Sequence, residues 1–162
     1  DGVASDGLNA APLIQLVSSE LSIGVVMLRL GRYAVGVLRG DTLVASKTDS
    51  RYVKSRHRAG GSSQRRFERS RERLIRELFD KTCEVVRGLF SPFESGMDSV
   101  LLGGERHILD GFVKRCRYIQ GLEQITLARV LQVGRPGQAA LDGIASEVWK
   151  SRVLVFADQD DT

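Results

Sequence analysis

Apolar residues first recur in three short runs separated by turns that contain glycine. The runs are residues 22–30, 32–38 and 42–48. Gly31 joins the first two runs and residues 39–41 join the next two, and connections this short suit β-hairpins. The pattern therefore predicts an antiparallel three-strand meander. Residues 10–20 precede it and predict a short helix with Pro12 near its first turn.

A helical period replaces the strand pattern after the third run. Apolar residues at spacings of three, four and seven predict one helix from about Ser63 to Phe90. They are Phe67, Leu74, Ile75, Leu78, Phe79, Val85, Val86 and Leu89. About 27 residues extend roughly 40 Å, which is longer than a small domain covers. We therefore expect the amphipathic second half to pack on the sheet and the charged first half to project into solvent.

The rest of the chain alternates between strand and helix patterns. Strands are predicted at 98–102, 126–133 and 152–157, and helices at about 105–118 and 138–150. A meander followed by strand–helix units indicates an α/β fold, a single domain whose mixed sheet carries helices on its faces. The length of 162 residues also favours one domain. We expect a lead-in with a short helix at 1–20, a main domain at 21–157 and an acidic tail at 158–162.

Composition excludes several classes of protein. No apolar run approaches the ~18 residues that span a bilayer, and no segment resembles a signal peptide. Cys83 and Cys116 are the only cysteines and lie in separate apolar stretches. We expect two buried thiols in a reducing compartment, with neither a disulfide nor a zinc site. Four carboxylates lack metal-ligand spacing, so we expect no metal: Glu105, Asp110, Asp142 and Glu147.

Charge is distributed unevenly. Residues 47–73 hold ten Lys or Arg and three acidic residues, a net charge of +7. The whole chain carries +4, so the remainder sums to −3. A charge run is often only a solvated helix face. An excess this local indicates a phosphate-rich partner when it borders a distinctive loop.

Such a loop lies within the basic segment. The stretch AGGSSQ, residues 59–64, is built from small residues and ends on Gln64, a neutral amide. Its flanking cations are Lys54, Arg56 and Arg58 before it, and Arg65, Arg66 and Arg69 after it. The loop precedes a helix N-terminus, where unpaired N–H groups favour anions. Glutamine does not titrate, so Gln64 can orient a water but cannot act as a conventional general base.

Several residues in and around these glycine-containing stretches have simpler structural explanations. Ser62 and Ser63 can serve as N-caps of the long helix. His57 is expected to lie near phosphates or in solvent. The second glycine pair, Gly103–Gly104, follows a strand without a dinucleotide or P-loop spacing, so close packing is the simpler cause. The stretch GRPGQ at 134–138 reads as a turn before a helix.

The stretch RHRAGGSSQRRFERSRE, after three strands and at the start of a long helix, resembles the catalytic loop of archaeal and eukaryotic-type peptide-chain release factors. It is most similar to the bacterial form of the Vms-like release factors. In that branch one or two residues separate a glycine pair from the glutamine. Here Ser62 and Ser63 separate Gly60 and Gly61 from Gln64, unlike the adjacent Gly-Gly-Gln of conventional factors.

The resemblance implies an RNase H-like domain and a ribosome-dependent peptidyl-tRNA hydrolase that rescues stalled ribosomes. Gln64 would position the hydrolytic water, Gly60 and Gly61 would shape the loop, and the flanking cations would bind phosphates of large-subunit rRNA and tRNA. It implies no cofactor, no membrane partner, a monomer and a cytoplasmic location. Two alternatives stay open: an RNA-binding or ribosome-binding module without hydrolysis, and a nuclease that cuts the tRNA 3′ end.

Overall fold

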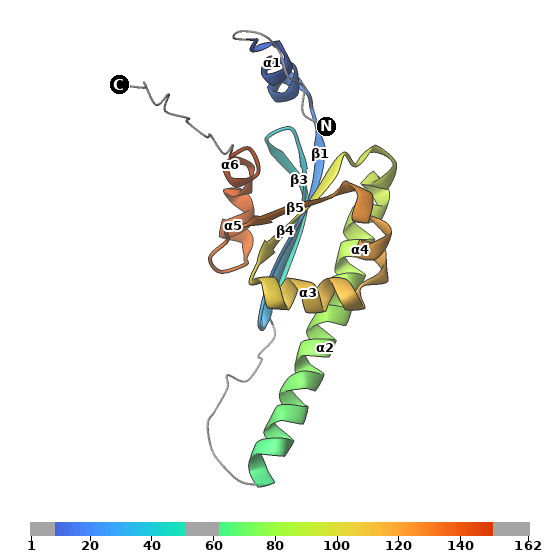
Figure 1. Ribbon diagram of the computed structural model, residues 1–162, viewed down its shortest axis with the longest axis vertical. Coiled ribbons are helices and arrows are strands. Elements are labelled where there is room, and N and C mark those ends of the chain that lie inside the picture. Colours follow the sequence, from blue (N-terminus) through green and yellow to red (C-terminus); the bar gives the residue numbers. More distant parts are fainter. Residues whose placement is uncertain (1–8, 51–61, 151–162) are drawn as a thin grey trace, which may run out of the picture.

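The three apolar runs form an antiparallel meander at one side of a five-stranded sheet (Figure 1). A computed structural model describes residues 9–50 and 62–150. The meander strands are β1 (Ser22–Arg29), β2 (Arg32–Arg39) and β3 (Thr42–Ser50). Gly31 and Gly40 adopt φ values of +81° and +59° in the two turns, a region that favours glycine. The predicted meander is therefore confirmed.

Two parallel strands complete the sheet beside β1. They are β4 (Ser99–Gly104) and β5 (Thr126–Leu131), and the strand order is β3-β2-β1-β4-β5. In the register, Val26 pairs with Val35 of β2 on one side and with Leu102 of β4 on the other. Parallel neighbours need long crossover connections, which helices supply here. The expected mixed sheet is confirmed.

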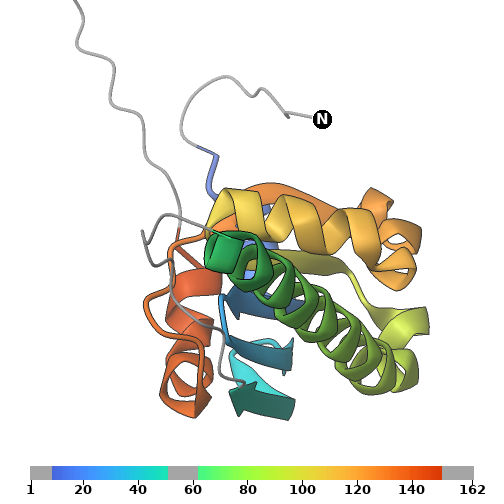
Figure 2. The ribbon, with the colours of Figure 1, turned by 90° about the horizontal axis from the view of Figure 1, so that it is seen from below.

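Helices cover both faces of the sheet (Figure 2). One face carries α2 (Ser62–Phe90), α3 (Arg106–Arg115) and α4 (Arg117–Gly121), whereas the other carries α5 (Gln138–Asp142) and α6 (Ile144–Val148). Alternate residues of β1 supply the two cores: Val26 and Leu28 face α2 and α3, and Val25 and Met27 face α5 and α6. This alternation is the period of two expected of a buried strand.

The remaining elements are short. They are α1 (Ala11–Ser18) and the 3₁₀ helices η1 (Ser91–Gly96) and η2 (Glu123–Ile125). Among the described residues, no helix combines the length and the apolar character needed to cross a membrane. The strand predicted at 152–157 lies outside the described residues.

Both predicted C-terminal helices are interrupted. The helix expected at 105–118 breaks at Cys116, whose backbone is extended with φ −89° and ψ +95°. The Gln120 side chain donates hydrogen bonds to the carbonyls of Val113 and Lys114 at 2.7 and 3.0 Å, so the end of α3 is satisfied there. The helix expected at 138–150 divides at Gly143 into α5 and α6.

Candidate nucleic-acid interface

The helix α2 has a packed half and an exposed half. Its 29 residues span about 43 Å at 1.5 Å per residue. Buried side chains begin at Leu78 and continue with Phe79, Thr82, Val86 and Phe90. The described side chains at positions 65–77 are all exposed or half-buried. We call residues 62–77 the arm, and it extends beyond the end of the sheet (Figure 1).

Arginines at the start of the arm have no acidic partner within the part of the chain that the structure describes. Arg65, Arg66 and Arg69 are exposed, and no ion pair links them to an acidic group in the described parts of the chain. Further along the arm, Arg73 and Arg76 pair with Glu77 and Glu72, at 3.7 and 4.0 Å. The charges nearest the helix start are therefore available to an external anion.

The first turn of α2 contains no acidic residue. A helix N-terminus carries a partial positive charge, so acidic side chains stabilise it and cations near it are unfavourable. Here Arg65 and Arg66 lie next to four backbone N–H groups that lack partners within the helix. This arrangement opposes the usual helix-terminus preference and suits a negatively charged partner at the tip of the arm.

The predicted catalytic glutamine falls inside this turn. Gln64 is the third residue of α2, after Ser62 and Ser63. The structure places the backbone of these three residues in the helix. Five other predicted site residues lie outside the described residues: Lys54, Arg56, Arg58, Gly60 and Gly61. His57 lies outside them too. Of the predicted site, α2 therefore brings together Ser62, Ser63 and Gln64 with Arg65, Arg66 and Arg69.

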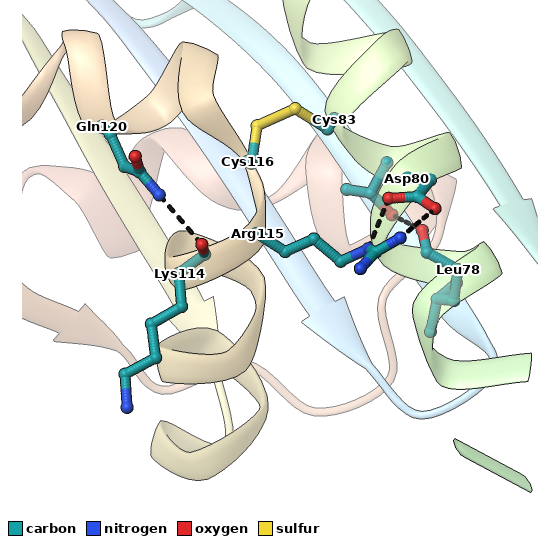
Figure 3. A network of polar contacts seen from close by, with 8 residues as sticks. Leu78, Asp80, Cys83, Lys114, Arg115, Cys116 and Gln120 are labelled. Atoms are coloured by element: carbon teal, nitrogen blue, oxygen red, sulfur yellow. Dashed lines mark hydrogen bonds and ion pairs between the residues drawn. A yellow bond between two sulfur atoms is a disulfide. The ribbon is translucent and has the colours of Figure 1, made fainter. Parts of the chain in front are cut away.

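The packed half of α2 is fixed to the neighbouring helices by a covalent bond. Cys83 and Cys116 form a disulfide with their Cα atoms 5.4 Å apart (Figure 3). The expectation of two unlinked thiols was wrong. Sequence spacing could not reveal the pair, because the break after α3 is what brings Cys116 against α2. The burial of Cys116, which the sequence did predict, is confirmed.

An ion pair lies beside the disulfide on the same two segments. Arg115 donates two hydrogen bonds to Asp80, from Nε to Oδ1 at 2.5 Å and from Nη2 to Oδ2 at 2.7 Å (Figure 3). The hydrogen bond from Arg115, reinforced by its charge, lowers the pKa of the Asp80 carboxyl. Phe79 and Phe112 pack edge to face between α2 and α3, with ring centroids 6.1 Å apart. These contacts give the arm a fixed base.

The second glycine pair has a structural cause. Gly104 adopts a φ of +134°, and a Cβ there would lie 2.1 Å from the carbonyl oxygen of Leu28. A Cβ on Gly103 would lie 3.2 Å from Leu131 and Val133. Both glycines therefore allow β4 to end in close contact with its neighbours, as expected for packing rather than phosphate binding.

The four carboxylates singled out in the sequence do not converge. Glu105 lies 3.4 Å from Arg29, Glu147 pairs with Lys150, and Asp142 accepts a hydrogen bond from Gln138. Across the described ranges, no three His, Cys, Asp or Glu residues group as metal ligands would.

Comparison with known proteins assigns the chain to a family. A family model described as "Actinobacteria/chloroflexi VLRF1 release factor" matches residues 22–154. The chain belongs to the VLRF1 release factor family. This match agrees with the resemblance of the basic loop.

Archaeal release factors are more distant relatives of this VLRF1 chain. Peptide chain release factor subunit 1 of Aeropyrum pernix is 29% identical over 147 residues, 90% of the chain and 39% of that protein. The Methanosphaera stadtmanae protein of the same name is 33% identical over 102 residues, 63% of the chain and 25% of that protein. The chain thus spans about two fifths or less of these relatives.

A solved structure shares the fold. The crystal structure of archaeal translation termination factor aRF1 superposes with a TM-score of 0.61 and 21% identity, covering 87% of the chain and 39% of that protein. This likeness supports the α/β architecture described above.

Proposed function

We propose that this VLRF1 chain hydrolyses peptidyl-tRNA on the ribosome, at the ester that joins the nascent peptide to the tRNA. One observation carries the proposal. Gln64 lies in the first turn of an arm that extends beyond the sheet, directly before the exposed Arg65 and Arg66. Membership of a release-factor family supports this reading.

The proposed chemistry gives the amide and the cations separate tasks. The Gln64 side chain orients a water toward the ester carbonyl through its oxygen and its N–H₂ group. Because an amide does not titrate, the proton leaves through groups of the substrate or the rRNA. Arg65, Arg66 and Arg69, with Lys54, Arg56 and Arg58, neutralise RNA phosphates, and Gly60 and Gly61 shape the approach to the site. No cofactor enters this scheme.

The scaffold is proposed to be RNase H-like, with residues 21–157 as the catalytic domain of a monomer. The strand order β3-β2-β1-β4-β5, with one antiparallel meander and helices on both faces, supports that arrangement. The rigid base of the arm supports the catalytic role of this domain, because a functional residue far from the core must be held by a rigid element.

The proposed substrate is a stalled ribosome that still carries peptidyl-tRNA. The resemblance to the Vms-like branch, rather than to conventional termination factors, favours rescue. The serine pair before Gln64 distinguishes this loop from an adjacent Gly-Gly-Gln and agrees with that branch.

A nuclease that cuts the tRNA 3′ end is the second candidate. Such chemistry usually needs grouped carboxylates, and in the described structure two of the four candidates are paired elsewhere: Glu105 with Arg29 and Glu147 with Lys150. We therefore favour ester hydrolysis over phosphodiester cleavage.

The test is single-turnover release of labelled peptide from stalled ribosomes at saturating protein. Gln64→Ala should reduce the rate by roughly 10²-fold, comparable to the loss of one oriented catalytic group. Gln124→Ala is the matched control, because Gln124 is an exposed glutamine in η2, beside the start of β5. Its rate should equal that of the wild type. A wild-type rate for Gln64→Ala would exclude a catalytic role for its side chain.

The tRNA product separates the candidates. An intact CCA end after release supports ester hydrolysis, whereas a shortened end supports the nuclease. Ribosome binding with neither product would indicate a binding module without hydrolysis.

A further inference from the structure

Strand directions bring several connections to one end of the sheet. β1, β4 and β5 are mutually parallel, and β3 runs in the same direction because β2 is antiparallel to both β1 and β3. The β1–β2 turn, the end of β3, the start of α3 and the chain after β5 therefore share this end (Figure 1). In the register, Arg32 pairs with Arg29 on one side and with Ser50 on the other.

Tight packing holds the start of α3 beside the β1–β2 turn. Gly104 pairs with Leu28 in the register and leaves no room for a Cβ against the Leu28 carbonyl. The next residue, Glu105, places Oε1 3.4 Å from Nε of Arg29. Arg106 is the first residue of α3, so it lies near the β1–β2 turn, which Arg32 follows directly.

The chain after β5 passes over the end of β4. Val133 lies 3.2 Å from the position of a Cβ on Gly103. Two residues later Arg135 is exposed, and Pro136 behind it is buried. Arg135, the third arginine, therefore follows β5 at this end of the sheet.

These three arginines have no ion-pair partner among the described residues. Arg106 and Arg135 are exposed and Arg32 is half-buried, and the described residues provide no ion pair for any of them. Two acids close to these arginines in the chain have other partners. Glu105 faces Arg29 and His107, and Asp49 accepts a hydrogen bond from the Ser50 N–H at 2.7 Å.

The arm lies at the same end of the molecule. α2 begins below the lower end of the sheet and runs back along it, and the start of α3 lies at that lower end as well (Figure 1). The large apolar side chains exposed in the described structure, Ile14, Val44 and Leu127, belong to α1 and to the opposite ends of β3 and β5. Among the side chains that the structure describes, this end is cationic and exposes no large apolar group, which suits a polyanion in water better than a lipid surface.

We propose that Arg32, Arg106 and Arg135 form a second phosphate-binding surface, the strand-end surface, that binds an RNA backbone next to the arm. The inference rests on the proposed function for the identity of the RNA, namely that of the ribosome. It adds a second contact that strengthens the binding of the chain to the RNA.

The experiment measures binding of the full chain to purified bacterial large ribosomal subunits over a range of salt concentrations. The test variant combines Arg32→Gln, Arg106→Gln and Arg135→Gln. The control combines Arg39→Gln, Lys114→Gln and Arg117→Gln, which removes the same charge from exposed positions. Arg39 is informative because it lies at the other end of β2 from Arg32.

The test variant should bind at least about tenfold more weakly at 0.1 M salt, and the slope of log affinity against log salt should flatten by about 2 to 3. The control should keep the slope of the wild type. Equal slopes for the test variant and the wild type would overturn the proposal, and so would equal losses in both variants. Thermal melting of each variant verifies that the fold is intact.

Peptide release distinguishes this inference from the proposed function. At saturating concentrations the test variant should release peptide within about twofold of the wild-type rate, because Gln64 is unchanged. If the wild type releases no peptide while the test variant still loses its salt dependence, the strand-end surface stands and the hydrolase proposal fails. If the wild type releases peptide and the salt slope of the test variant is unchanged, the hydrolase proposal stands and the strand-end surface fails.

Discussion

Cys83 and Cys116 are joined by a disulfide that links the packed half of α2 to the boundary between α3 and α4. The Asp80–Arg115 ion pair joins the same segments beside it. Together they hold the base of the arm, whose described side chains are exposed or half-buried. A rigid base and an exposed arm fit the proposed role of Gln64 at the ribosome.

Removing the disulfide should destabilise the fold without changing its topology. The bond closes a loop with a sequence separation of 33 residues. Loop-closure entropy then predicts that Cys83→Ala with Cys116→Ala lowers the free energy of unfolding by about 3–4 kcal/mol. The melting temperature should fall by roughly 10 °C, as calorimetry would record. Reductant should lower the melting temperature of the wild type by a similar amount and leave that of the variant unchanged. If the wild type, unfolded without reductant, shows two titratable thiols, the disulfide is not formed and the prediction is contradicted.

The Asp80–Arg115 pair should make stability depend on acid pH. The folded state lowers the pKa of Asp80 below its usual 3.8. Its contribution is therefore present above that value and is lost as the pH falls through the lower, folded pKa. Asp80→Asn should reduce the free energy of unfolding at pH 7, and the loss should shrink as the pH falls below 3.8. Urea denaturation of the wild type and of Asp80→Asn, repeated from pH 7 into the acid range, measures this difference in the free energy of unfolding. Glu123→Gln, which removes an exposed acid without an ion-pair partner in the described structure, is the charge-matched control.

Two glycine substitutions should have opposite effects. Gly104→Ala forces a Cβ to within 2.1 Å of a backbone oxygen at a φ of +134°, and should cost at least about 2 kcal/mol of unfolding free energy. Gly88→Ala faces open space within α2 and should add about 0.5–1 kcal/mol by raising helix propensity. Chemical denaturation measures both. A neutral Gly104→Ala would show that the end of β4 relaxes easily.

The arm arginines should govern binding rather than chemistry. Arg65→Ala with Arg66→Ala removes two cations that lack acidic partners in the described structure. Ribosome affinity should fall, and the salt slope should flatten by about 1.5 to 2. The rate of peptide release should recover at saturating protein. Lys114→Ala with Arg117→Ala serves as the control and should match the wild type. A rate that stays low at saturation would place an arginine in the chemical step.

Sequence alone determined the elements whose signals are local. The period of two and the short glycine turns determined β1 to β3, and one helical period determined α2 to within one residue of its start. The motif around Gln64 identified the family, because a glycine pair, a lone amide and clustered arginines are adjacent in the chain. These features need no knowledge of which segments meet in space.

Only the tertiary structure decided which distant residues meet. Cys83 and Cys116 look like two separate buried thiols until α3 packs on α2 and the chain turns at Cys116. Arg32, Arg106 and Arg135 are unremarkable in sequence, and the parallel direction of β1, β4 and β5 is what brings their connections to one end of the sheet. Local pattern encodes the elements because it reflects backbone geometry and burial. Pairing between elements depends on long-range packing, which no single window of sequence contains.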